Sequence, residues 1–193
     1  MSGQGSGSTP VQDIRVVEIS DRIAGSYCGK LLVDVGAEVR KFEPPQGDPL
    51  RRYSASCSSM PDGVDSPLFG YLNAGKRGRT WSGAGPRSDE RYHDELAGAD
   101  IIVVTGTRRQ AAELGIDPQR LLVDNPRAVV VTISDFGWNG PYADRPASEF
   151  TLQAWSGLTG FRGDPAGPPI AIGGELGEYM GGVFGAFGAL ALR

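Results

Sequence analysis

Histidine and cysteine are scarce in this chain, and their scarcity limits the chemistry that it can carry. Of 193 residues, two are cysteines, Cys28 and Cys57, and one is a histidine, His93. Two cysteines without a CxxC or Cys/His ligand spacing exclude a disulfide framework, and we expect no metal site. A catalytic triad built on histidine would have to use His93, which lies in "RYHDELAGAD", a segment typical of an exposed helix.

The chain also lacks long apolar runs and a net positive charge. The last apolar run, "GGVFGAFGALAL", has 12 residues, whereas a membrane-spanning helix needs about 20. The net charge of −4 and the pI of about 5.0 argue against nucleic acid as a partner. Residues 1–10 form a Gly/Ser tail without the features of a signal peptide. We expect this tail to be disordered and the protein to be cytoplasmic, with no membrane partner.

Segments typical of strands alternate with segments typical of helices. Apolar, β-branched stretches occupy 14–19, 37–43, 100–106 and 128–136, and helical patterns occupy 24–36 and 88–99, the latter with Ser88 as the expected N-cap. Near-continuous apolar strands that alternate with helices form parallel sheets covered on both faces. The sequence therefore predicts an α/β fold over residues 11–193, a doubly wound, mostly parallel sheet of Rossmann type.

The terminal helix carries glycines at regular spacing and a carboxylate at its start. Gly177, Gly181, Gly185 and Ala189 recur every fourth residue, so one face is nearly bare and should pack against a neighbouring element. Glu178 lies in the first turn, where the helix dipole stabilises a negative charge. Glu178 could be a surface residue matched to that dipole. It could equally be a nucleophilic carboxylate flanked by backbone N–H groups that hold an oxyanion.

Two loops carry paired cations that could bind phosphate. Arg51 and Arg52 end "FEPPQGDPLRR", which follows the second predicted strand, and Lys76 and Arg77 lie in "NAGKRG". At the carboxyl edge of a sheet such loops can receive phosphates, although both could also be solvated surface loops. Neither GxGxxG after the first strand nor GxxxxGK[ST] occurs, so NAD or ATP bound in the usual mode is not predicted.

Taken in order, these segments resemble the family III CoA-transferases, the group of formyl-CoA transferase, carnitine CoA-transferase and the bile-acid CoA-transferases. The resemblance runs from about Val11 to the end. It is carried by "AGSYCGKLLVDVGAEVRKFEPPQGDPLRR", "NAGKRG", "ELAGADIIVV", "LLVDNPRAVVVTISDFGWNGPYADRP", "SGLTG" and "GELGEYMGG". It implies transfer of CoA from an acyl-CoA to a small carboxylic acid by way of carboxylate-bound intermediates, with no permanently bound cofactor.

The chain departs from the family pattern at several of its functional positions. Glu178, in "LGEYMG", stands where the family has its catalytic aspartate. Thr105 and Gly106 stand where the family has residues that hold CoA, and Trp81 stands where an aliphatic residue often touches CoA. Near "SEF" the racemase relatives carry a His-Asp pair, and Glu149 in this chain argues against a racemase.

Family members are about twice as long, so the chain resembles the N-terminal part of the large domain, without the smaller domain and the returning C-terminal segment. The resemblance implies an interlocked homodimer. We carry two hypotheses. In the first, the chain is an active CoA-transferase domain with Glu178 as nucleophile and the paired cations near the CoA phosphates. In the second, it is a catalytically degenerate half that supports a second, active CoA-transferase domain.

Overall fold

The computed structural model describes residues 11–164 and 166–193; the expected tail at 1–10 lies outside the described residues. Five strands form one sheet: β1 (Arg15–Ile19), β2 (Glu38–Glu43), β3 (Arg77–Thr80), β4 (Ile101–Thr105) and β5 (Val129–Ile133). The helices are α1 (Ile23–Asp34), α2 (Pro67–Asn73), α3 (Glu90–Ala97), α4 (Arg108–Glu113), α5 (Pro118–Asp124), α6 (Glu149–Trp155) and α7 (Leu176–Leu192). In the described part of the chain, no helix is long and apolar enough to cross a membrane.

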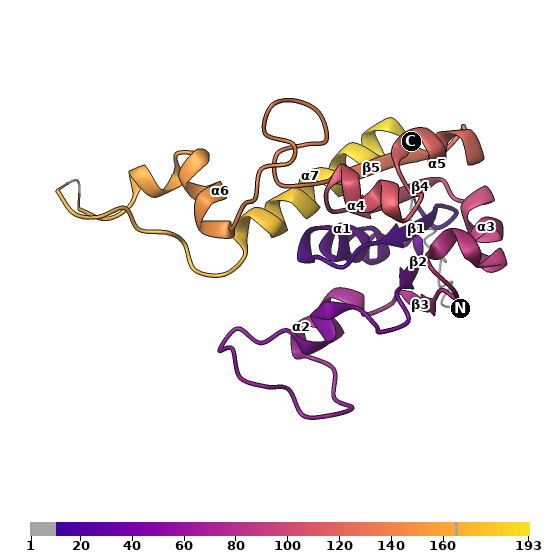
Figure 1. Ribbon diagram of the computed structural model, residues 1–193, viewed down its shortest axis with the longest axis horizontal. Helices are drawn as coiled ribbons and strands as arrows, with labels where there is room; N and C mark the ends of the chain where they lie inside the picture. Colours follow the sequence, from indigo (N-terminus) through magenta and orange to yellow (C-terminus); the bar gives the residue numbers. More distant parts are fainter. Residues whose placement is uncertain (1–10, 165) are drawn as a thin grey trace, which may run out of the picture.

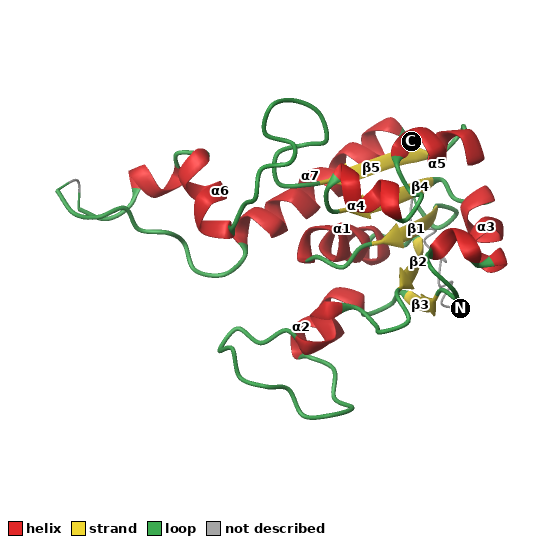
Figure 2. Ribbon diagram, in the orientation of Figure 1, coloured by secondary structure: helices red, strands yellow, loops and turns green. Residues whose placement is uncertain are grey.

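The sheet is parallel throughout, with the strand order β3-β2-β1-β4-β5. Val17 pairs with Arg40 on one side and with Ile102 on the other, so β1 lies between β2 and β4 in the centre of the sheet. This order is that of a Rossmann-type sheet, so the predicted fold is confirmed. Figure 2 shows the strands in yellow between layers of red helices.

Each face of the sheet carries its own apolar core. Val17 and Ile102 belong to a cluster completed by residues of α3, α4 and α5, whereas Val16 and Ile101 belong to a cluster completed by residues of α1 and α7. Successive residues of a strand point to opposite faces. Because both faces of the sheet are covered, a central strand needs apolar residues on both sides. Strand β4 is accordingly apolar and buried along its whole length.

One predicted helix start was wrong. Helix α3 is capped by Asp89, whose Oδ1 accepts a hydrogen bond of 3.0 Å from the backbone N–H of Arg91. Ser88 instead ends a short 3-10 turn that begins at Pro86, and its hydroxyl donates to the carbonyl of Gly85. Proline favours the first position of such a turn. The turn begins at Pro86 and includes Ser88, so the next residue, Asp89, caps α3.

Helix α7 packs against α1 at very short range, and glycine makes this possible (Figure 1). A Cβ at Gly182 would lie 2.7 Å from the carbonyl oxygen of Ala24 and 3.1 Å from the backbone nitrogen of Cys28. A Cβ at Gly185 would lie 2.9 Å from Ile133 on β5. The expected packing of the bare helix face is confirmed at Gly185, whereas Gly182, which makes the closest backbone contact, lies outside the predicted face. The segment that carries α6 projects beyond the sheet, on the side where α7 begins (Figure 1).

A network of four charged side chains is buried under α1. The Glu18 carboxylate of β1 contacts Lys41 Nζ and Lys76 Nζ at 2.8 Å each, and Lys41 Nζ also contacts Asp48 at 2.9 Å. Burial opposes the charge on Glu18, but the two ammonium groups outweigh it and lower the pKa of this carboxyl. Lys76 shows the opposite balance: burial lowers its pKa, and Glu18 offsets only part of that effect.

The buried network predicts a large loss of stability in Glu18→Gln. Breaking a buried ion pair leaves uncompensated charge and costs about 3–5 kcal/mol, which denaturant unfolding would measure. The exposed Glu113→Gln should cost less than about 0.5 kcal/mol.

Because the folded pKa of Glu18 lies below its ordinary value of 4.5, the contribution of Glu18 to the free energy of unfolding is present above that pH and is lost as the pH falls. Unfolding of Glu18→Gln should therefore respond less to acid than that of the wild type.

The contact between α1 and α7 predicts opposite effects for two glycines of one helix. Gly182→Ala should lower the free energy of unfolding by about 1–3 kcal/mol, because the new methyl group meets backbone atoms of α1. Gly188→Ala meets nothing within 4 Å and should stabilise the helix by about 0.5–1 kcal/mol. Equal effects of the two substitutions in denaturant unfolding would contradict the packing described here.

Candidate active site

The carboxyl ends of three strands and the first turn of α7 meet at one edge of the sheet. Arg22 follows β1, Thr105 ends β4, and Ser134 and Asp135 follow β5. The strand order reverses between β1 and β4, and in open parallel sheets ligands bind outside the carboxyl ends of the strands at such a point. Glu178, in the first turn of α7, lines the same cavity as these residues.

Both oxygens of the Glu178 carboxylate are hydrogen-bonded by the start of α1. Oε2 accepts a bond of 2.8 Å from the backbone N–H of Ala24, and Oε1 accepts one from Arg22 Nη2. The N-cap residue of α1 is Arg22, whose side chain makes no capping bond. Glu178 therefore satisfies one of the N–H groups that a helix start leaves free, and its charge faces the positive ends of two helix dipoles.

Arg22 connects this carboxylate to a second one. Its Nη2 bonds both Glu178 Oε1 and, at 2.8 Å, Asp135 Oδ1. Partial burial opposes the positive charge, but the hydrogen bond to Asp135 and the charges of both carboxylates outweigh it and raise the pKa of the guanidinium. The Glu178 side chain is 12% exposed and that of Arg22 36% exposed. A solvent-accessible cation is thus held between two carboxylates.

The Glu178 side chain lines a cavity of about 380 Å³. Apolar side chains from β5, α6, α7 and the turn after α6 form much of its wall: Ile133, Leu152, Leu158, Leu176 and Met180. Its charged side chains, among the described residues, are Arg22, Asp135 and Glu178. An apolar pocket with a few convergent polar groups is the usual form of a small-molecule site.

A second cavity, of about 280 Å³, adjoins the first at Thr105, which lines both. Its wall includes Trp81, Pro44 and Gln110. Thr105 is 8% exposed, and its Oγ1 has no hydrogen-bond partner among residues 11–164 and 166–193. Buried hydroxyls are nearly always hydrogen-bonded, so a free one between two cavities indicates a place for a ligand atom.

Two further carboxylates lie around the start of α7. Glu149 Oε1 accepts a hydrogen bond of 2.8 Å from the backbone N–H of Gly177 and one of 2.8 Å from Gln153 Nε2. Burial, together with the charges of Glu149 and Glu178, raises the pKa of Glu175. These contacts attach α6 to α7 and fix the turn that carries Glu178.

The structure separates the predicted site residues into two groups. Thr105 is shared by the two cavities, with Glu178 in one and Trp81 in the other. Gly106 adopts a φ of +105° next to Thr105, which favours glycine, and its carbonyl accepts a bond of 3.0 Å from Trp138 Nε1. These predicted residues therefore lie together at the carboxyl edge of the sheet.

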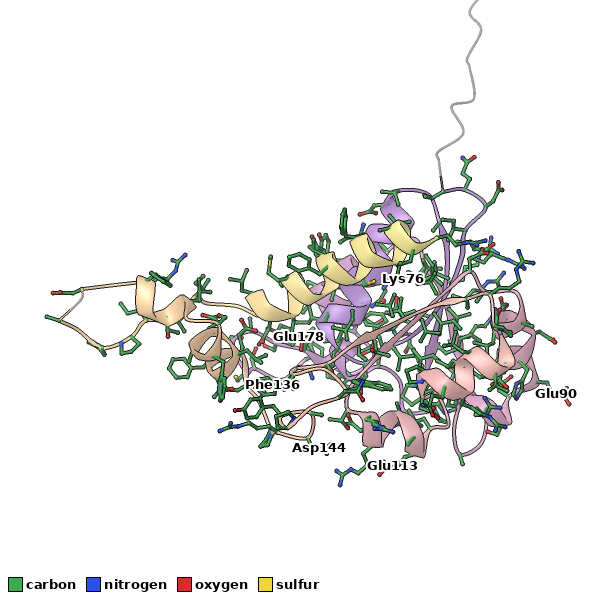
Figure 3. All side chains as sticks on the ribbon, turned by 90° about the horizontal axis from the view of Figure 1, so that it is seen from above. Lys76, Glu90, Glu113, Phe136, Asp144 and Glu178 are labelled. Atoms are coloured by element: carbon green, nitrogen blue, oxygen red, sulfur yellow. The ribbon has the colours of Figure 1, made fainter. Side chains whose placement is uncertain are left out.

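The four predicted phosphate-binding cations line neither of these two cavities. Arg51 forms ion pairs with Glu43 and Asp65. The Lys76 side chain is 1% exposed and forms an ion pair with Glu18; Figure 3 labels both Lys76 and Glu178. Arg52 and Arg77 are exposed; Arg52 Nη1 donates to the carbonyl of Pro61 at 2.8 Å, and Arg77 Nη1 lies 3.0 Å from Glu38. Their role in binding CoA stays a prediction.

Sequence reasoning missed Arg22 and Asp135. Both follow strands of the sheet, Arg22 after β1 and Asp135 after β5, so position at the carboxyl edge was the signal that could have found them. Arg22 also stands where a helix usually begins with a Ser, Thr, Asp or Asn cap. A cation at that position indicates that the helix start is capped from elsewhere, here by Glu178.

Comparison with known proteins gives one consistent result. A family profile described as CoA-transferase family III matches residues 11–192. The chain is 30% identical over 178 residues to a succinate–glutarate CoA-transferase of Agrobacterium fabrum, covering 91% of this chain and 44% of that protein. It is 33% identical over 181 residues to a formyl-CoA:oxalate CoA-transferase of Streptomyces avermitilis, covering 94% and 43%. The chain thus spans less than half the length of these curated relatives.

Solved structures and subunit names add two facts. A CaiB/BaiF family protein of Brucella suis superposes with a TM-score of 0.82 at 28% identity, covering 95% of this chain and 49% of the other. Relatives from Chloroflexus aurantiacus are named as the alpha and beta subunits of a succinyl-CoA–L-malate CoA-transferase, at 32% and 30% identity. Some relatives of this chain are therefore built from two kinds of subunit.

Proposed function

This chain belongs to CoA-transferase family III, and we propose that it moves CoA from an acyl-CoA to a carboxylic acid through covalent intermediates on Glu178. One observation carries the proposal: Glu178 lies in a cavity that shares Thr105 with a second cavity lined by Trp81. We propose that a long, two-part substrate occupies both cavities at once. Its CoA portion would lie beside Trp81, Thr105 and Gly106, and its thioester would reach Glu178.

In the proposed reaction an oxygen of Glu178 attacks the thioester carbonyl carbon. The C–S bond breaks, and the CoA thiolate leaves behind a mixed anhydride. The thiolate then attacks the glutamyl carbonyl carbon, the donor acid leaves, and Glu178 carries CoA as a thioester. A weak nucleophile of this kind needs donors aimed at the developing oxyanion. In the second step the oxyanion develops on the glutamyl oxygen, and the Ala24 N–H, 2.8 Å from Oε2 in the free site, can donate to it.

The four cations predicted to bind phosphate differ in the contacts that their side chains already make. Arg52 and Arg77 have exposed side chains and could reach a phosphate without breaking a buried contact. Lys76 would have to leave Glu18, and Arg51 would have to leave Glu43. We therefore propose Arg52 and Arg77 for the phosphates, while Arg51 and Lys76 shape the loops. The interlocked dimer and the cytoplasmic location stay predictions.

A second candidate function is a supporting half for an active CoA-transferase domain. It is favoured by the engagement of both Glu178 oxygens, one by Arg22 and one by Ala24. Each bond draws electron density from the carboxylate and occupies one lone-pair site of an oxygen, which weakens Glu178 as a nucleophile. In the supporting function Glu178 would serve as a structural cap of α1.

Covalent trapping distinguishes these two functions. The wild-type protein is incubated with butyryl-CoA, whose acyl group carries no charge, and then with hydroxylamine, which converts a glutamyl thioester or anhydride into a hydroxamate. Peptide mass spectrometry should find the hydroxamate at Glu178 in the wild type and none in Glu178→Gln. Glu90→Gln, an exposed carboxylate on α3 that lies far from Glu178 (Figure 3), should leave the modification intact. Absence of any adduct at Glu178 would reject it as nucleophile.

The unpartnered hydroxyl gives a test of CoA binding. Thr105→Val removes a buried hydroxyl without a protein partner, so the free energy of unfolding should stay unchanged or rise. CoA should bind about 3- to 10-fold more weakly, because one hydrogen bond is lost. Calorimetric titration with CoA measures this loss. Thr132→Val, on β5 and outside both cavities, is the matched control. Unchanged CoA affinity in Thr105→Val would contradict the proposed site.

A further inference from the structure

The cavity that holds Glu178 contains one cation among its described lining residues, Arg22, and that cation lies between two carboxylates. We propose that Arg22 binds the carboxylate of the acceptor acid after Glu178 has been converted to its CoA thioester, and that Asp135 is the positioning residue for Arg22. This inference rests on the proposed function, because it assigns to the same site the group that recognises its second substrate.

The charges along the cavity wall change when Glu178 reacts. Before the reaction, Asp135 and Glu178 carry two negative charges against the single positive charge of Arg22. Such a wall disfavours a second anion, since like charges repel. Conversion of Glu178 to the thioester makes it neutral and leaves Arg22 with Asp135 alone. The cavity then admits a carboxylate, so the charge balance itself selects the order of acyl-CoA first and free acid second.

Geometry places the incoming acid next to the reacting carbon. Arg22 Nη2 contacts Oε1 of Glu178 in the free site, so a carboxylate that takes over this donor lies beside the glutamyl carbonyl carbon. Asp135 Oδ1 bonds the same nitrogen at 2.8 Å and keeps the guanidinium in place when Glu178 no longer attracts it. With its side chain 36% exposed, Arg22 is open to the ligand.

The reaction of the acceptor follows from this placement. One carboxylate oxygen of the acid stays on Arg22, and the other attacks the carbonyl carbon of the Glu178 thioester. The C–S bond breaks, and CoA leaves as the thiolate. The thiolate then attacks the acyl carbon of the acceptor, the C–O bond of the anhydride breaks, and Glu178 returns as a carboxylate. Arg22 is again held between two carboxylates when the product acyl-CoA departs.

The apolar cavity wall around Arg22 indicates what the rest of the acid, apart from its carboxylate, should be. Leu152 and Leu158, together with Met180 of α7, line the same cavity. Apolar side chains favour a hydrocarbon chain, because burying apolar surface is the main source of its binding energy. Butyrate, which carries one carboxylate and a short apolar chain, is therefore the probe of choice.

Glu178→Gln tests the inference without any CoA, because the side-chain amide of glutamine is neutral like the thioester of Glu178. In calorimetric titration at pH 7, butyrate should bind Glu178→Gln at least about 10-fold more tightly than the wild type, as expected for one charge-assisted hydrogen bond. The double variant Arg22→Gln with Glu178→Gln should lose this gain. Arg109→Gln with Glu178→Gln, which removes an exposed cation on α4, should keep it.

Butyramide provides a comparison that needs no second substitution. It has the shape of butyrate without its charge, so it should bind Glu178→Gln at least 10-fold more weakly than butyrate. Equal binding of the two probes, or no gain over the wild type, would overturn the role of Arg22. Because this titration contains no CoA, its result is independent of the hydroxylamine trap. A failed trap rejects Glu178 as nucleophile, whereas a failed titration rejects only the acid site.

Discussion

The close contact between α1 and α7 is the constraint on which the site depends. With no Cβ at Gly182, the backbone of α7 can approach the carbonyl of Ala24 closely enough for Glu178 to reach the first turn of α1. A bulkier residue would separate the helices, and Glu178 would then lose the N–H donor that holds Oε2. Glycines that look costly within a helix are thus needed to bring a carboxylate to a helix start.

Much of the fold and part of the site could be predicted from local patterns. The alternation of apolar strands with helices can be predicted because the polarity of each residue indicates whether it is buried. Glu178 can be singled out because it directly follows a glycine in the first turn of a helix. Arg22 and Asp135 could not be paired in advance, since they lie 113 positions apart and meet only through the sheet. Their contact depends on strand order, which short-range patterns do not contain.

Lys76 shows a different limit of sequence reasoning. In the sequence it stands beside Arg77 in a glycine-rich loop, a context typical of an exposed cation. In the structure its ammonium group lies under α1 and contacts Glu18, which stands between the apolar residues Val17 and Ile19 of β1. A buried charge needs a partner, so the presence of Glu18 within β1 was the available indication that one or more lysines would be drawn into the core.

The start of α1 unites these observations. In dinucleotide-binding folds the corresponding helix start after the first strand binds a phosphate, through its free N–H groups and dipole. Here Glu178 occupies that position and accepts the bond from Ala24. The glycine fingerprint serves to bind a pyrophosphate at this helix start, and the chain lacks it after β1. The Glu178 carboxylate supplies the negative charge instead, and it excludes a pyrophosphate from the same place. The anion site of the fold is thereby occupied by a carboxylate of the chain itself, and Arg22 compensates its charge.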